Sequence, residues 1–409
     1  MGLFGTLLVS VLIFTVYILF LVLILLLAQN KIGVSGEVKL LINGDDSLSK
    51  TVNAGSTLLT TLSSQGILIP SACGGGGTCG MCKVKVLDGA GDLLPTETGH
   101  ISRKEAKENL RLACQVKVKN DLKLEIPDEI FNIKKYECTV RSNRNVATFI
   151  KEFILDIDGG EVLDFKAGGY IQIEVPAYGK IPYDRFDIEK EYHSDWDKYR
   201  VWDNVAICDE PVIRAYSMGN HPAEGNRVML NVRIATPPPG TNFPPGICSS
   251  YIFSRKPGDK VTISGPYGEF FIKETDREMC FIGGGAGMAP MRSHIYHQFL
   301  TEHTKRRCTF WYGARSFREM FYHEEFLEIE KNNSNFTYTV ALSEPLPEDN
   351  WKGAVGFIHQ VVHDNYLKDH EDPTEIEYYL CGPPMMLSAV NKMLYDLGVE
   401  KEMIMFDEF

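Results

Sequence analysis

The stretch SACGGGGTCGMCKV, residues 71–84, places three cysteines around four consecutive glycines. Cys73, Cys79 and Cys82 have the spacing C-x5-C-x2-C, and a fourth thiol, Cys114, lies farther along the chain. Four thiolates in a three-plus-one arrangement suit a 2Fe–2S cluster, because each of its two irons takes two cysteine sulfurs. The glycines fit this interpretation, since a loop around a compact inorganic core needs backbone without Cβ clashes and N–H groups that reach the sulfides.

Two other uses of these cysteines are weaker interpretations. A structural zinc site usually has two close C-x2-C pairs, and this quartet has only one. Zinc and disulfides therefore remain as the lesser alternatives. The stretch resembles 2Fe–2S ferredoxins, and its five-residue first gap matches the adrenodoxin-like branch rather than the plant-type spacing.

The composition bounds the remaining possibilities. A length of 409 residues predicts two to three domains, each able to bury a core. A net charge of −12 argues against nucleic acid as a partner. The cysteines outside the quartet show no paired spacing, so reduced thiols in a cytosolic compartment are the simpler interpretation. These cysteines are Cys138, Cys208, Cys248, Cys280, Cys308 and Cys381.

The N-terminal segment predicts a membrane anchor over residues 1–30. Residues 2–30 contain no charged side chain, and about 26 apolar-dominated residues are long enough to cross a bilayer as a helix. The alternative, a signal peptide, needs a basic leading region and a shorter apolar core. Lys31, Lys39 and Lys50 follow the segment and no basic residue precedes it. The positive-inside bias therefore predicts a single-pass protein with its soluble domains facing the cytoplasm.

Three modules are expected after the anchor, in a multidomain α+β and α/β chain. Residues 36–130 alternate like strands, for example in CKVKVL and LACQVKV, and have helical stretches at 56–66 and 102–111, which fits a β-grasp ferredoxin domain. Residues 134–272 have short strands broken by Gly and Pro, which indicates an antiparallel β-barrel. Residues 278–409 alternate strands and helices, as in a Rossmann-like parallel α/β domain.

The predicted barrel carries RAYSMGNHP at residues 214–222. Arg214 can clamp a pyrophosphate, and strand alternation puts Tyr216 on the same face, where its ring can stack on a flavin. Ser217 can hydrogen-bond the flavin ring. An R-x-Y-S tetrapeptide alone is weak evidence and is usually an ordinary strand.

A second motif strengthens the flavin interpretation. PPGICSSYI places Gly246, Cys248, Ser249 and Ser250 just before a helix-like run, where small residues and open N–H groups make a phosphate cradle. R-x-Y-S, then G-x-x-S before a helix, then GPYGEF at 265–270 is an order that resembles ferredoxin–NADP⁺ reductase-type flavoproteins. In that family these motifs bind FAD.

The last module opens with FIGGGAGMAP, residues 281–290. Gly283, Gly284, Gly285 and Gly287 close a strand and Pro290 starts a helix, so the turn can approach a pyrophosphate at a helix N-terminus. Glycine-rich turns also occur in folds that bind nothing, so the motif is not decisive by itself.

Its partner motif is CGPPMM, residues 381–386, which begins after a strand. In the resembled reductases the segment of Cys381 and Gly382 borders the nicotinamide, and a chain-end aromatic residue, here Phe409, shields the flavin. The plain alternatives are that Cys381 is a small buried residue and Phe409 a frayed tail.

The segment after the second strand of this module bears on nucleotide choice. Relatives specific for NADPH place cationic and hydroxyl groups there to hold the 2′-phosphate. This chain has Arg315 and Arg318 but also Glu319, whose carboxylate repels a phosphate if it faces the ribose. NADH is therefore the predicted nucleotide, with residual use of NADPH.

Together the modules predict one electron path. NADH gives a hydride to FAD, which releases electrons singly to the cluster. The N-terminal segment and an acidic, aromatic stretch at residues 183–203 distinguish the chain from soluble oxygenase reductases. Taken by itself, that stretch is open to a plain interpretation as a solvated surface excursion.

Both features, with VRIATPPPG and GARSFREMFYHEEF, resemble the F subunits of the sodium-translocating NADH:quinone oxidoreductases over essentially the whole chain. The resemblance implies an NADH-entry component of a bacterial inner-membrane pump. It also implies other integral membrane subunits as partners, ubiquinone as the indirect acceptor, and Na⁺ export. The alternatives are a membrane-tethered, NADH-dependent reductase of an oxygenase system and, less favoured, an iron–sulfur scaffold without catalysis.

Overall fold

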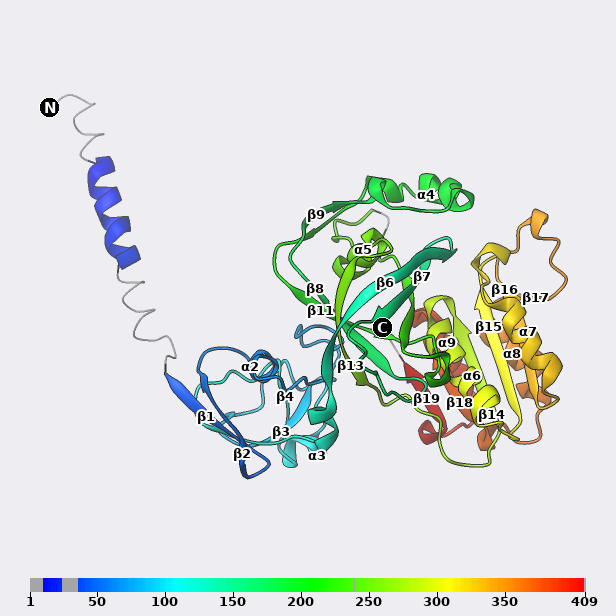
Figure 1. The fold of residues 1–409 in the computed structure, drawn as a ribbon, viewed down its shortest axis with the longest axis horizontal. Coiled ribbons are helices and arrows are strands. Elements are labelled where there is room, and N and C mark those ends of the chain that lie inside the picture. Colours follow the sequence, from blue (N-terminus) through cyan, green and yellow to red (C-terminus); the bar gives the residue numbers. More distant parts are fainter. Residues whose placement is uncertain (1–9, 24–35, 239, 408–409) are drawn as a thin grey trace. The chain divides into compact units, whose positions relative to one another are not determined.

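Two compact units make up the structure, a computed structural model (Figure 1). The first unit ends at Asn132 and lacks the short segment Ser71–Gly74, which groups with the second unit, Ile133 onward. The parts of the 409-residue chain that the structure describes are residues 10–23, 36–238 and 240–407.

The N-terminal segment is helical over residues 10–23, and its apolar side chains, such as those of Leu12 and Phe14, are exposed. The rest of the predicted anchor, residues 1–9 and 24–30, lies outside the described residues. Within the described ranges, no helix combines the length and the apolar character needed to cross a membrane. The anchor over residues 1–30 thus stays a prediction.

A mixed five-stranded sheet forms the centre of the first unit. Alternate residues of its strand β1 (Val38, Leu40 and Ile42) are buried, which is the period-two pattern of a half-buried strand. β1 runs parallel to β5, and the other neighbouring strands are antiparallel. In spatial order the strands are β2 (Asp45–Asn53), β1 (Glu37–Ile42), β5 (Leu122–Glu125), β3 (Lys83–Asp88) and β4 (Leu110–Leu112).

Two short helices accompany this sheet, as predicted. α2 (Leu58–Ser64) begins after Thr57, whose hydroxyl accepts a hydrogen bond from the Thr60 N–H. α3 (Arg103–Lys107) begins with a capping box between Ser102 and Glu105.

The prediction of a strand over LACQVKV is wrong beyond Leu112, where β4 ends. There the N–H groups of Gln115 and Val116 both bond to the Leu112 carbonyl, at 2.8 and 3.1 Å. These bonds close a turn, and Cys114 lies in that turn rather than in a strand.

An antiparallel barrel opens the second unit. Its sheet closes because Met218, next to β11, bridges to Leu230 of β12. Phe153, Ile171 and Ile263 are fully buried inside it. In spatial order the strands are β11 (Val212–Ser217), β8 (Tyr170–Val175), β13 (Lys260–Tyr267), β6 (Lys134–Ala147), β7 (Ile150–Ile157) and β12 (Arg227–Arg233).

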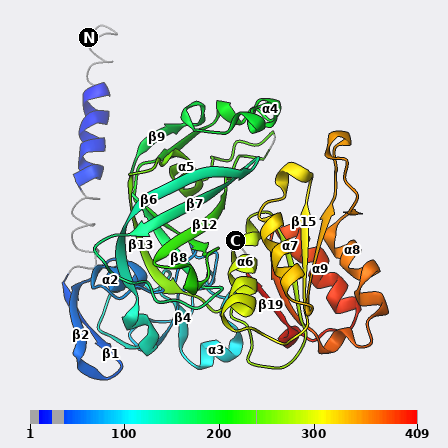
Figure 2. The ribbon, with the colours of Figure 1, turned by 45° about the vertical axis from the view of Figure 1, so that its right-hand side comes forward.

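A parallel six-stranded sheet follows the barrel (Figure 2). Every residue of its strand β14, MCFIGG, is buried, as expected for a parallel strand covered on both faces. In spatial order the strands are β17 (Ala354–Val355), β16 (Phe336–Leu342), β15 (Cys308–Ala314), β14 (Met279–Gly284), β18 (Glu377–Cys381) and β19 (Ile404–Asp407).

Helices cover both faces of this sheet. α6 (Met288–Tyr296) and α7 (His323–Asn332) pack on the face that contains Phe281, whereas α8 (Ile358–Asn365) and α9 (Pro384–Asp396) pack on the face that contains Ile282. The chain proceeds from β14 outward through β15 to β17 and then returns to β18 on the other side of β14. Ligands of open α/β sheets bind at such a switch point, beyond the carboxyl ends of the strands.

Candidate functional site

The glycine-rich turn lies at this switch point. After β14, residues Gly285–Gly287 form a single 3₁₀ turn and α6 follows directly. A Cβ on Gly287 would lie 2.2 Å from the Cys381 carbonyl oxygen, and Gly285 has a left-handed φ of +55°. Gly287 cannot be replaced without moving the Cys381 carbonyl, and the left-handed conformation at Gly285 favours glycine. α6 begins at Met288, so the prediction that Pro290 starts the helix is wrong by two residues.

The second nucleotide motif lies beside the first. Cys381 is the last residue of β18, not the residue after it, and it pairs in register with Gly283 of β14 and Asp407 of β19. A Cβ on Gly382 would lie 3.1 Å from the Gly284 carbonyl oxygen. Burial, and then the nearby Asp407 carboxylate, raise the pKa of the Cys381 thiol well above its usual value. Cys381 is therefore a neutral thiol and not a thiolate nucleophile.

Asp407 is a residue of this site that the sequence analysis missed. The Ser217 hydroxyl donates a hydrogen bond of 2.5 Å to Asp407 Oδ2, although the two residues lie 190 positions apart. Burial raises the pKa of the Asp407 carboxyl, and the bond from Ser217 opposes this shift. Phe409, which was predicted to shield the flavin, lies outside the described residues.

A cavity of about 460 Å³ opens between the barrel and the parallel sheet. A second cavity of about 500 Å³ shares four lining residues with it (Arg233, Gly284, Gly285 and Pro383), so the two cavities adjoin. Volumes of this size are typical of cofactor and substrate sites. Of the predicted residues, the first cavity is lined by Tyr216, Ser217, Gly284, Gly285, Gly287 and Gly382. The second is lined by Gly284, Gly285 and Glu319.

The remaining predicted flavin residues lie on β11 and α5 (Ile247–Ser254), which pack together. Arg214 and Tyr216 are two residues apart on β11 and therefore on one face, and the Arg214 guanidinium donates to the Ile213 carbonyl at 2.7 Å. Gly246 is the N-cap of α5.

Ser249 and Ser250 lie inside the first turn of α5, not before it. Their hydroxyls already have protein partners. Ser249 accepts from the Ala235 N–H at 3.1 Å, and Ser250 bonds the Gly246 carbonyl at 2.6 Å. Among the polar groups of this turn, the backbone N–H groups thus remain the better candidates to meet a phosphate.

The four predicted cluster ligands are divided between the two units. Cys79, Cys82 and Cys114 belong to the first unit, whereas Cys73 lies in the segment Ser71–Gly74. Burial raises the pKa of Cys82 to about 12, and the nearby thiols of Cys114 and Cys79 also raise it. Among the described residues, no group of three or more His, Cys, Asp or Glu side chains is gathered closely enough to hold a metal ion. The four-cysteine ligand set therefore stays a prediction.

The loop around these thiols nevertheless fits an iron–sulfur cluster. Cysteine sulfur is the ligand that such clusters require, and the Gln115 amide donates to Cys114 Sγ at 3.4 Å. A Cβ on Gly77 would lie 2.6 Å from that amide nitrogen, and one on Gly80 would lie 2.8 Å from the His100 ring. Both glycines have left-handed φ angles, so the loop depends on them.

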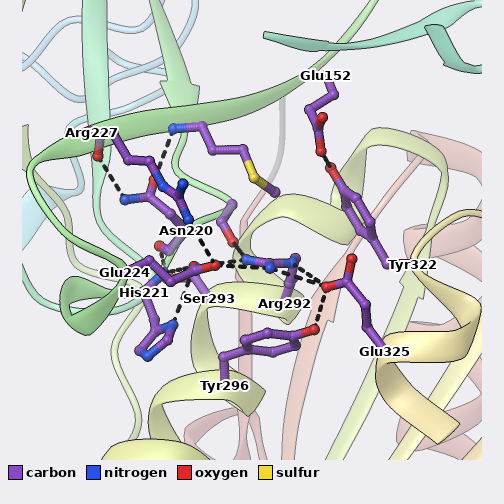
Figure 3. A network of polar contacts seen from close by, with 12 residues as sticks. Glu152, Asn220, His221, Glu224, Arg227, Arg292, Ser293, Tyr296, Tyr322 and Glu325 are labelled. Atoms are coloured by element: carbon purple, nitrogen blue, oxygen red, sulfur yellow. Dashed lines mark hydrogen bonds and ion pairs between the residues drawn. The ribbon is translucent and has the colours of Figure 1, made fainter. Parts of the chain in front are cut away.

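A buried polar network ties the barrel to α6 and α7 (Figure 3). Arg292 of α6 binds both carboxylate oxygens of Glu224, at 2.8 and 2.9 Å, and Glu325 of α7 at 3.1 Å. Its side chain is only 7% exposed. Ser293 bonds the Asn220 carbonyl at 2.8 Å. Because the glycine-rich turn leads directly into α6, this network helps set the position of the turn relative to the barrel.

Three protein-family models match the chain. They are a 2Fe-2S iron-sulfur cluster binding domain at residues 42–119, an oxidoreductase FAD-binding domain at 201–272 and an oxidoreductase NAD-binding domain at 281–392. The matches support one 2Fe–2S cluster, FAD and a nicotinamide nucleotide.

The chain is also similar to curated relatives over almost its whole length. It is 59% identical to the F subunit of the Na(+)-translocating NADH-quinone reductase of Actinobacillus succinogenes, over 97% of both chains. It is 58% identical to the protein of the same name from Neisseria gonorrhoeae, over 98% of both chains.

Solved structures resemble the fold more distantly. The ferredoxin reductase in carbazole 1,9a-dioxygenase is 26% identical, with a TM-score of 0.60, and the match covers 91% of this chain and 98% of that one. An Amycolatopsis cytochrome P450 reductase is 24% identical with a TM-score of 0.63, at the same coverage, and it indicates the fold alone.

Proposed function

Because this chain belongs to the family of F subunits of the Na(+)-translocating NADH-quinone reductases, we propose that it is the NADH-oxidising, electron-input component of a sodium-pumping complex. Its electrons pass to other membrane subunits and then to ubiquinone, coupled to Na⁺ export. The observation that carries the proposal is the 58–59% identity over 97–98% of the chain, in a chain that matches models for all three redox modules.

Each module has residues suited to its group. When bound, FAD exchanges two electrons with NADH, and the 2Fe–2S cluster takes one electron at a time. The proposed cluster ligands are Cys73, Cys79, Cys82 and Cys114. The proposed FAD residues are Arg214, Tyr216, Ser217, Gly246, Ser249 and Ser250. The proposed NADH residues are Gly283, Gly284, Gly285, Gly287, Pro290, Glu319, Cys381 and Gly382. The three domains are proposed at 36–130, 134–272 and 278–409.

Asp407 acts, in this proposal, as a positioning residue for Ser217. An ionised carboxylate that accepts the Ser217 hydrogen bond holds the hydroxyl in one orientation, and its raised pKa makes this role sensitive to pH. The Asp407→Asn substitution keeps the size of the side chain but removes its charge and its titration. We expect the rate of flavin reduction by NADH to fall roughly tenfold, which is the loss of one charge-assisted hydrogen bond.

Stopped-flow absorbance measures this rate directly. In the unmodified chain the rate should also fall as the pH falls through the raised pKa of Asp407, because protonation removes the negative charge that accepts the Ser217 bond. This dependence should disappear in the Asp407→Asn variant, which a purely structural role would not produce. An unchanged rate and pH profile would exclude this role for Asp407. The exposed Asp396, which pairs with Lys392, provides a control through Asp396→Asn.

For location, we propose a single-pass protein of the bacterial inner membrane with its soluble domains facing the cytoplasm. The exposed apolar side chains of residues 10–23 and the uncharged residues around them support this placement.

Native membranes test the function and the location together. NADH oxidation should require quinone and increase with Na⁺, and membranes washed with alkaline carbonate should retain the chain. The second candidate function, a membrane-tethered oxygenase reductase, is favoured by the structural similarity to the carbazole dioxygenase reductase. Copurification with a hydroxylase, together with NADH oxidation that needs neither quinone nor Na⁺, would support that alternative and contradict the pump.

A further inference from the structure

The stretch at residues 183–203, here called the excursion, is not a solvated surface loop. Its two ends are held by the antiparallel pair β9 (Gly179–Pro182) and β10 (Val205–Cys208). Trp196, in its helix α4 (His193–Lys198), is fully buried, and the indole donates to the Thr148 carbonyl at 2.8 Å. The plain interpretation from the sequence is therefore wrong, because aromatic side chains anchor the excursion in the barrel core.

The other side of α4 contacts the segment that follows β15. Asp195 pairs with Arg318, at 2.8 Å between Oδ2 and Nη1. The Tyr199 hydroxyl accepts a hydrogen bond of 3.3 Å from Arg315. Both arginines that could serve a phosphate are thus bound to the excursion.

Glu319 is the fourth member of this group of charged side chains, together with Asp195, Arg315 and Arg318. It accepts a hydrogen bond from the Thr148 hydroxyl and lies 3.6 Å from the Arg315 guanidinium. Thr148 is also the residue whose carbonyl holds Trp196, so the anchor of the excursion and the Glu319 carboxylate share one support. Two carboxylates and two guanidiniums balance one another here.

Two of these four charged residues lie beside the glycine-rich turn. Arg315 and Glu319 line the cavity of about 500 Å³ that also contains Gly284 and Gly285 of the glycine-rich turn. In dinucleotide-binding α/β folds, an acidic residue beyond the glycine turn bonds the 2′-hydroxyl of the adenosine ribose, and an arginine nearby accommodates a 2′-phosphate instead. Glu319 and Arg315 are residues of these two types, and they lie 3.6 Å apart in one cavity.

We propose that the excursion makes the nucleotide site selective for NADH over NADPH, because Asp195 and Tyr199 keep Arg318 and Arg315 from binding a 2′-phosphate. The inference rests on the proposed function, since it concerns the nucleotide of that same site. A 2′-phosphate brings a charge between −1 and −2, and it must compete with Asp195 for Arg318 and with Glu319 for Arg315. The 2′-hydroxyl of NADH is uncharged. It can therefore lie beside the Glu319 carboxylate without electrostatic repulsion and without competing for either arginine.

The Asp195→Ala variant of the full chain tests the proposal. Arg318 is then free, and we expect kcat/KM for NADPH to rise about five- to tenfold while kcat/KM for NADH changes less than twofold. Binding should change in the same sense, independently of catalysis. Affinity for adenosine 2′,5′-bisphosphate should rise by a similar factor and affinity for 5′-AMP should not, because the two probes differ only in the 2′-phosphate.

Three further variants make the result decisive. Asp203→Ala breaks an exposed ion pair in the same excursion, in which Asp203 lies 2.7 Å from Arg200. It should leave unchanged both the NADPH-to-NADH ratio of kcat/KM and the ratio of the affinities for adenosine 2′,5′-bisphosphate and 5′-AMP. Asp195→Ala combined with Arg318→Ala should return both ratios to the values of the unmodified chain. Asp195→Asn provides a milder change if the alanine variant loses FAD.

Two outcomes would overturn the proposal. One is an unchanged NADPH-to-NADH ratio in an Asp195 variant that still binds FAD and oxidises NADH. The other is an equal loss with both nucleotides, which would assign the excursion to stability alone. Failure of the unmodified chain to oxidise NADH would instead contradict the proposed function, and the two failures are thereby distinguished.

Discussion

Quinone reduction should fall more than a hundredfold when Cys82 is replaced by serine. A serine hydroxyl is a harder and poorly ionised ligand, so the cluster should be lost or strongly destabilised. The residues proposed for FAD and NADH lie in the second unit, which has its own core, and both nucleotides should still bind. The Cys82→Ser variant should therefore still bleach its flavin absorbance with NADH and reduce small acceptors that reach the flavin.

The assembled complex is the right material for this measurement, with iron content determined on the same samples. Cys208→Ser serves as the control, because Cys208 is also buried but its thiol already donates to the Glu210 carbonyl at 3.0 Å, a role that a serine hydroxyl can take. Cys208→Ser should keep iron and quinone reduction. Normal quinone reduction in an iron-free Cys82→Ser complex would show that electrons bypass this loop.

Local patterns in the sequence predicted those parts of the fold that depend on nearby residues. The buried apolar run of β14 followed by Gly283–Gly287 indicated a parallel strand and a glycine-rich turn into a helix, and the structure has both. The Arg214–Tyr216 alternation likewise predicted a shared strand face. The turn at Cys114 was missed because LACQVKV alternates like a strand, whereas two N–H groups converge on the Leu112 carbonyl instead.

The features that were missed at the site depend on contacts between distant segments. Asp407 was missed because its role needs β19 to pair with β18 while Ser217 approaches from the barrel. Nothing close to Asp407 in the sequence indicates that contact. The burial of Trp196 was missed for the same reason, since an acidic stretch with scattered aromatic residues has no regular period. A network such as that of Arg292 arises only when two modules pack together.

Replacing Arg292 by alanine should have the largest effect on stability. The substitution leaves the carboxylates of Glu224 and Glu325 without their shared cation, and Glu224 is largely buried. Breaking a buried ion pair from one side typically costs about 3–5 kcal/mol. We expect the free energy of unfolding of the second unit to fall by about this amount. Urea titrations followed by tryptophan fluorescence report on this unit alone, because all four tryptophans of the chain lie in it (Trp196, Trp202, Trp311 and Trp351).

The pH dependence separates this ion pair from simple loss of packing. Burial alone would raise the pKa of Glu224, but hydrogen bonds from His221 and the ion pair with Arg292 hold it well below its usual value. A carboxyl with a lowered pKa in the folded state stabilises the protein above its unfolded pKa of about 4.3, and this stabilisation is lost as the pH falls toward the folded pKa. The unmodified chain should therefore lose stability below about pH 4.3, and Arg292→Ala should lose much less over the same range.

A matched surface pair shows how much of the effect belongs to burial. Lys392 and Asp396 lie 2.8 Å apart on α9 with both side chains exposed, and Lys392→Ala should cost no more than about 0.5 kcal/mol. If Arg292→Ala costs as little, the network does not fix α6 against the barrel. If instead the cost is large, flavin reduction by NADH should also slow at temperatures where the variant is folded, because the glycine-rich turn that leads into α6 would no longer be held beside Ser217.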